Sequence, residues 1–82
     1  MNIYVSNLNF STTSESLQEL FAAHGDVESA KIITDRESGR SRGFGFVEMP
    51  NDTEGQNAIS ELNETDFEGK TISVNVARPK TR

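Results

Sequence analysis

The sequence of 82 residues contains no cysteine and no tryptophan, and it has a single histidine, His24. Without cysteine the chain can form no disulfide, and it offers neither a thiolate metal ligand nor a thiol nucleophile. One histidine leaves little for metal binding or for general-base catalysis. We therefore expect no metal, no cofactor, no small-molecule substrate and no enzymatic activity.

Long hydrophobic runs are also missing. No apolar segment approaches the ~20 residues of a membrane-spanning helix, so we expect no membrane partner. Residues 1–5 lack the basic start and the apolar stretch of a secretory signal, which favours a cytoplasmic location. A chain of this length has room for one hydrophobic core. We expect one domain over residues 1–78 and a short basic tail over residues 79–82.

Charge is unevenly distributed along the chain. The 13 acidic and 8 basic residues give a net charge of −5, which counts against nucleic acid binding because domains with that function are usually basic. Most of the acidic residues lie in segments 15–28 and 52–68, which contain no Lys or Arg, whereas most of the basic residues lie in segments 31–42 and 78–82. This segregation removes the objection, because one part of the surface can be cationic.

The first half of the chain predicts a strand followed by a helix. Ile3 and Val5 alternate with polar residues, which is the period of a half-buried strand. Thr12, followed three residues later by Glu15, predicts the start of a helix that ends near Gly25.

The second half predicts a hairpin, a helix and a last strand. Segments 27–34 and 42–49 are predicted strands, separated by a polar turn. Asn51 is a candidate helix cap, with Glu54 reaching back to it, and segment 71–77 alternates as a strand. The order βαββαβ is the α+β, ferredoxin-like arrangement, a four-stranded antiparallel sheet with two helices on one face.

The strand over residues 42–49 carries aromatic side chains on the wrong face for a core. Phe44 and Phe46 alternate with small or aliphatic residues and share a face with Arg42, and Tyr4 lies on the corresponding polar face of the first strand. Each ring left in water forgoes roughly 1.5–3 kcal/mol of burial. This arrangement indicates a ligand that covers the rings. Gly43 and Gly45 would face the helices, where a missing side chain allows strand and helix to approach closely.

Two segments carry a resemblance to a known family. Residues 42–49 resemble the RNP1 octapeptide of the RNA recognition motif, K/R-G-F/Y-G/A-F-V-x-F/Y, and residues 3–8 resemble its RNP2 hexapeptide. Within this family the sequence resembles small bacterial single-motif proteins and glycine-rich RNA-binding proteins. Met49 departs from the aromatic residue of the pattern, but this position should face the core, so the binding face should be unaffected.

The resemblance implies that the chain binds single-stranded RNA and plays a post-transcriptional role. It implies that Tyr4 and Phe46 each stack on a base, that Phe44 packs against sugar rings, and that Arg42 pairs with a phosphate. Further contacts are expected from the sheet edges, the hairpin loop and the tail: Lys31, Ile33, Ser73, Asn75, Ala77, Arg78, Arg36, Arg40, Lys80 and Arg82. Phe10, Phe21 and Phe67 are expected to pack in the core or in loops and are given no function.

Three alternatives stay open. The same fold supports acylphosphatases, but these resemble one another in an arginine-containing loop, and residues 7–11 contain no arginine. A protein partner on the helical face is a second alternative, in addition to RNA or in place of it. Single-stranded DNA is a third, because stacking platforms accept either sugar.

Overall fold

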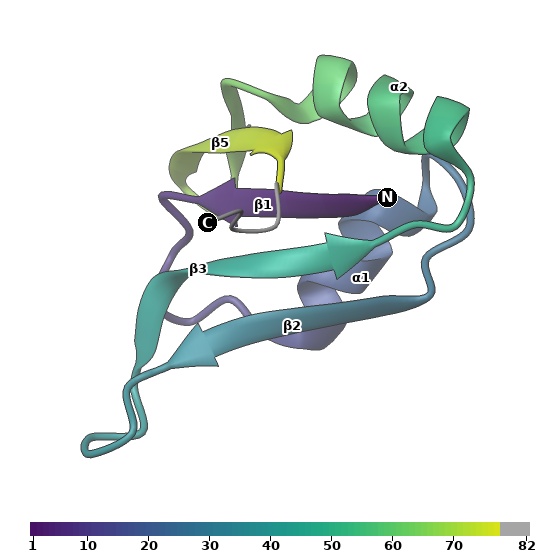
Figure 1. The fold of residues 1–82 in the computed structure, drawn as a ribbon. Helices are drawn as coiled ribbons and strands as arrows, with labels where there is room; N and C mark the ends of the chain where they lie inside the picture. The colour runs from purple at the N-terminus through teal and green to yellow at the C-terminus, as the bar shows by residue number, and fades with distance from the viewer. Residues whose placement is uncertain (78–82) are drawn as a thin grey trace, which may run out of the picture.

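The computed structural model describes residues 1–77, in which two helices cover one face of an antiparallel sheet (Figure 1). The elements in chain order are β1 (Asn2–Ser6), α1 (Ser14–Ala22), β2 (Ser29–Thr34), β3 (Ser41–Glu48), α2 (Asp52–Leu62), β4 (Thr65–Phe67) and β5 (Lys70–Val76). The strand order is β2-β3-β1-β5-β4, and every neighbouring pair is antiparallel. The expected α+β ferredoxin-like fold is confirmed, with β1 in the middle of the sheet between β3 and β5.

The prediction of four strands is wrong by one, because β4 adds a fifth. Its residues pair with β5 in a hairpin whose two-residue loop is Glu68 and Gly69. Both loop residues have positive φ, 52° and 86°, which is the condition of a type I′ turn. Asn-Gly or Asp-Gly is the usual sequence signal for this turn. Here Glu68 occupies the first position, so the sequence does not carry that signal.

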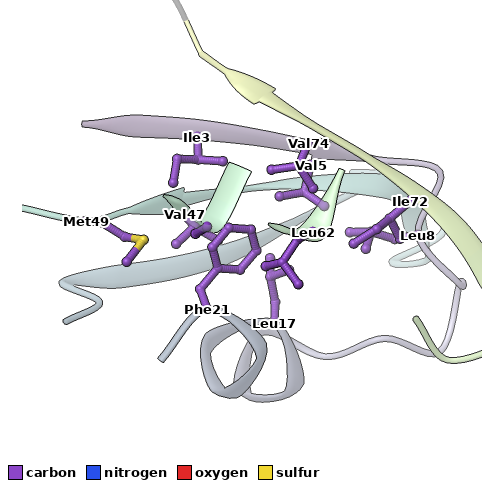
Figure 2. Packing of buried hydrophobic residues seen from close by; sticks show 11 residues of the cluster. Ile3, Val5, Leu8, Leu17, Phe21, Val47, Met49, Leu62, Ile72 and Val74 are labelled. Carbon is purple, nitrogen blue, oxygen red and sulfur yellow. The ribbon is translucent and has the colours of Figure 1, made fainter. Parts of the chain in front are cut away.

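The core lies between the sheet and the helices. Leu17 and Phe21 on α1 point toward the sheet, and both belong to one buried cluster with Val47 of β3 (Figure 2). All three side chains are fully or almost fully buried. Burying a side chain of this size stabilises the folded state by roughly 1.5–3 kcal/mol, so these contacts hold α1 on one face of the sheet. Met49 is also fully buried, as its position in the alternation predicted.

The helix caps differ in part from the expected ones. Thr13, not Thr12, caps α1, and its side-chain oxygen accepts a hydrogen bond from the Ser16 N–H at 3.1 Å. Thr12 is buried, and its hydroxyl donates to the Glu68 carboxylate instead. Sequence spacing alone did not separate two adjacent threonines, because the choice between them depends on this long-range contact.

The cap of α2 is confirmed, but its predicted reciprocal contact is wrong. The Asn51 side chain accepts from the Glu54 N–H at 2.9 Å. The Glu54 carboxylate accepts from the Asp26 N–H at 3.1 Å rather than from the cap residue. The contact therefore ties the start of α2 to the loop between α1 and β2.

The structure corrects the interpretation of two glycines in β3. A Cβ at Gly45 would collide with the Lys31 carbonyl oxygen of β2, and one at Gly43 would lie 3.4 Å from a ring carbon of Phe10. Neither of these contacts is with a helix. Gly45 allows two strands to approach closely, while Gly43, at a φ of +82°, adopts a conformation that residues with side chains rarely reach.

Candidate nucleic-acid interface

Tyr4, Phe44 and Phe46 project from the face of the sheet opposite the helices. In the register of β1 and β3, Tyr4 lies opposite Phe46, and Ser6 lies opposite Phe44. The intervening positions of β3, including Val47, are buried against the core. The period of two therefore separates the aromatic side chains from the core side chains, as the sequence predicted.

The three rings form one group, which we name the aromatic cluster. The ring centroids of Tyr4 and Phe46 lie 5.5 Å apart, those of Tyr4 and Phe44 5.8 Å apart, and those of Phe44 and Phe46 6.5 Å apart. These are contact distances for tilted and edge-to-face aromatic pairs. Phe46 is 37% exposed, and the other two rings are half-buried. The rings support one another while each keeps part of its surface open to solvent.

The edge of this face toward β2 combines apolar and charged groups. Lys31 lies opposite Phe46 in the pairing of β2 with β3, and it is exposed. A hollow of about 450 Å³ opens here, and it is lined by Asn2, Ser29, Lys31, Ile33, Phe46, Glu48 and Ala77. It offers a concave surface beside the most exposed ring, with an ammonium donor and a carboxylate acceptor.

On the other side of β1, two residues of β5 extend the face. Asn75 lies opposite Tyr4, and its side chain is exposed. Ser73 lies opposite Ser6 and is half-buried. The structure thus brings the predicted residues Lys31 and Asn75 to opposite sides of the aromatic cluster, Lys31 on the strand next to Phe46 and Asn75 on the strand next to Tyr4.

Cationic side chains lie at the end of the face where β3 begins. Arg42 is exposed and shares a hollow of about 310 Å³ with Tyr4, Phe44 and Lys70. Arg40 is exposed in the loop between β2 and β3. Within residues 1–77 neither arginine has a carboxylate at ion-pair distance. Their charges are available to a phosphate.

The predicted contacts from Arg78, Lys80 and Arg82 lie outside the described residues. The assignment of residues 79–82 to a basic tail stays a prediction for the same reason.

The loop between β2 and β3 is closed by hydrogen bonds to Asp35. Its carboxylate accepts from the N–H groups of Glu37 at 2.8 Å and Ser38 at 3.2 Å. These two bonds, with a smaller contribution from the charge of Arg42, lower the pKa of Asp35 below its ordinary value of 3.8. Asp35 is therefore ionised at neutral pH and holds the loop that carries Arg36 and Arg40.

The prediction that Phe10 packs in the core or in a loop is wrong. Phe21 is fully buried and Phe67 is partly buried against the core, but Phe10 is 73% exposed. The residue follows β1 in a loop, where no periodicity reports which way a side chain points. Its neighbours Asn9 and Ser11 form an Asx turn, in which the Asn9 side-chain oxygen accepts a hydrogen bond from the Ser11 N–H at 2.9 Å.

The described residues offer little for other classes of site. Among residues 1–77 no group of three or more His, Asp and Glu side chains could hold a metal ion. Neither α1 nor α2 has the length and apolar character that crossing a membrane would demand.

A helix-backed sheet with an open aromatic face and flanking cations is typical of a class of domains, those that bind single-stranded nucleic acid. The RNA recognition motif family matches residues 3–73. The chain belongs to the RNA recognition motif family. This membership confirms the resemblance drawn from residues 3–8 and 42–49, and it confirms that the domain is not an enzyme.

Relatives of this family include plant and bacterial proteins. Over 80 residues the chain is 50% identical to the RNA-binding protein CP31B, chloroplastic, of Arabidopsis thaliana, covering 98% of this chain and 28% of that protein. It is 46% identical to a protein designated RbpB of Nostoc sp., covering 98% of this chain and 78% of that protein. The chain thus spans about a quarter of the chloroplast relative and most of the bacterial one.

Two solved structures show the same fold. The crystal structure of RNA binding protein PG1 has a TM-score of 0.94 and 48% identity, and the match covers 100% of this chain and 99% of that one. The Sxl-lethal protein/RNA complex has a TM-score of 0.91 and 32% identity, covering 98% of this chain and 48% of that one.

Proposed function

We propose that the chain binds single-stranded RNA on the open face of its sheet. The observation that carries the proposal is the aromatic cluster, in which Tyr4, Phe44 and Phe46 lie 5.5–6.5 Å apart on the face that the helices leave uncovered. Tyr4 and Phe46 stack on bases, Phe44 contacts sugar rings, and Arg42 pairs with a phosphate. The names of CP31B and PG1, and the RNA in the Sxl-lethal complex, support the same ligand.

The physical basis of this function is stacking. Stacking a base on an aromatic side chain contributes about 1–3 kcal/mol and tolerates any base, because every base has a π-face. Selectivity then falls to polar groups at the edges of the cluster. In this proposal Lys31 and Glu48, which line the hollow beside Phe46, and Asn75, which lies opposite Tyr4, contact the edges of stacked bases.

Several expectations stay predictions. A post-transcriptional role follows from RNA binding, and a cytoplasmic location follows only from the sequence of the first residues. A protein partner on the helical face is compatible with RNA on the opposite face. Single-stranded DNA remains an alternative ligand, because only contacts to the 2′-hydroxyl distinguish the two sugars.

The proposal is tested by fluorescence anisotropy with a short degenerate RNA. The double variant Phe44→Ala, Phe46→Ala should lose on the order of tenfold or more in affinity, because it removes two of the three rings. Gln18→Ala is the matched control, since Gln18 is exposed on α1, and it should bind as the parent does.

Circular dichroism on each variant separates lost contacts from lost folding. The DNA version of the same oligonucleotide, titrated in parallel, shows whether the sugar matters. Equal RNA affinity for the parent and the folded double variant would contradict the proposal.

A further inference from the structure

Phe10 is an exposed aromatic side chain that the proposed function does not use. It is 73% exposed, about twice the exposed fraction of Phe46 in the aromatic cluster. Phe10 lies in the loop between β1 and α1. A ring this open to water is a site that a flat, apolar ligand can cover.

The loop that carries Phe10 is held by hydrogen bonds. The Asn9 carbonyl accepts from the Thr12 N–H at 3.0 Å, which closes a turn with Phe10 and Ser11 at its centre. The Asn9 side chain accepts from the Ser11 N–H at 2.9 Å and donates to the Glu68 carbonyl at 3.0 Å. Phe10 therefore projects from a fixed turn that is anchored to the loop between β4 and β5.

The ring of Phe10 lies beside the start of β3. One of its ring carbons is 3.4 Å from the position that a Cβ would take at Gly43, the residue before Phe44. The hollow of about 310 Å³ that contains Tyr4 and Phe44 also reaches Phe10. The exposed ring is thus continuous with the aromatic cluster.

Cationic side chains line the hollows that this ring also lines. Arg42 and Lys70 line the hollow that joins Phe10 to the aromatic cluster. Phe10 and Arg40 also line a second hollow of about 450 Å³. Within residues 1–77 none of these three cations has a carboxylate at ion-pair distance. Apolar surface flanked by unneutralised cations is complementary to a nucleotide, which combines a flat base with a phosphate.

We propose that Phe10 is a fourth stacking platform, which binds one further nucleotide of the same RNA strand where that strand passes beyond Phe44. Arg40 and Arg42 neutralise phosphates on either side of this nucleotide. The inference rests on the proposed function, because the strand reaches Phe10 only by way of the sheet. It extends the binding site from the sheet to the loop between β1 and α1.

A comparison of two RNA lengths tests this inference. The sheet aromatics of such a domain stack about two or three bases, so a trimer fits on the sheet and a hexamer reaches Phe10. Phe10→Ala should weaken hexamer binding roughly 5- to 100-fold and leave trimer binding unchanged, as measured by NMR titration. Phe10→Trp, which keeps a stacking surface, should restore hexamer affinity, and Gln18→Ala, at an exposed position on α1, is the control.

The outcomes distinguish this inference from the proposed function. If the parent binds the hexamer and Phe10→Ala binds it equally well, the fourth platform is wrong and RNA binding by the sheet stands. Equal losses of affinity for the trimer and the hexamer also overturn it, because Phe10 would then be needed for binding on the sheet itself. If the parent binds neither RNA, both proposals fail.

Discussion

Gly45 stands where the backbone of β2 lies close to β3. A Cβ at this position would collide with the Lys31 carbonyl oxygen and would lie 3.3 Å from the Ile32 Cα, and both of these atoms are backbone. Backbone atoms of a paired strand cannot move aside as a flexible side chain can. The absence of a side chain at Gly45 therefore maintains the pairing that sets Lys31 beside Phe46.

The variant Gly45→Ala tests this packing. It should destabilise the protein by about 1–3 kcal/mol, because the added methyl group forces β2 away from β3. The free energy of unfolding from urea denaturation measures the effect. Ser29→Ala, an exposed position on β2, is the control and should change stability by less than about 0.5 kcal/mol. A Gly45→Ala protein as stable as the parent would show that the strands separate without cost.

Single residues also show what the sequence can and cannot reveal. The outward placement of Tyr4, Phe44 and Phe46 was predictable, because strand side chains alternate with a period of two. The placement of Phe10 was not, because a turn has no period. The contact of Gly45 with β2 was also hidden, since a sequence indicates which face a residue is on but not how near the neighbouring strand lies.

At the scale of elements, the short hairpin of β4 and β5 positions the loop between β1 and α1, which is distant from it in the sequence. Asn7 and Asn9 donate to the carbonyl groups of Thr71 at 2.6 Å and Glu68 at 3.0 Å. The Thr12 hydroxyl also donates to Glu68. The turn that joins β4 to β5, together with the start of β5, thus anchors the loop that carries Phe10.

The loop between β2 and β3 gives a pH prediction. The folded-state pKa of Asp35 is lowered, so its ionised form stabilises the loop above pH 3.8, and this contribution is lost as the pH falls through 3.8 toward the lowered value. The amide signals of Glu37 and Ser38 should therefore titrate in NMR spectra with a midpoint below 3.8.

The variant Asp35→Asn is the control for this titration. It keeps an acceptor oxygen but cannot ionise, so the acid titration of the two amide signals should disappear. A midpoint at or above 3.8 in the parent would contradict the hydrogen bonds from Glu37 and Ser38 that close the loop.

At the scale of the whole molecule, the helical face and the open face of the sheet differ in the charged side chains they carry. Exposed carboxylates lie on the helices, including Glu15 and Glu19 on α1 and Asp52 and Glu61 on α2. Lys31 and the arginines of the loop and of β3 flank the open sheet. A net charge of −5 is therefore compatible with RNA binding, because the negative charge repels RNA from the helical face. The segregation was visible in the sequence, and the fold converts it into two faces.

The position of RNA on the molecule is the most direct test of the central claim. Isotope-labelled protein in complex with a short single-stranded RNA should give intermolecular NOEs from the ring protons of Tyr4, Phe44 and Phe46 to base and ribose protons. The amide signals of α1 and α2 should change little. Intermolecular NOEs confined to the helices, with the three rings unperturbed, would contradict the claim that RNA binds by stacking on the sheet.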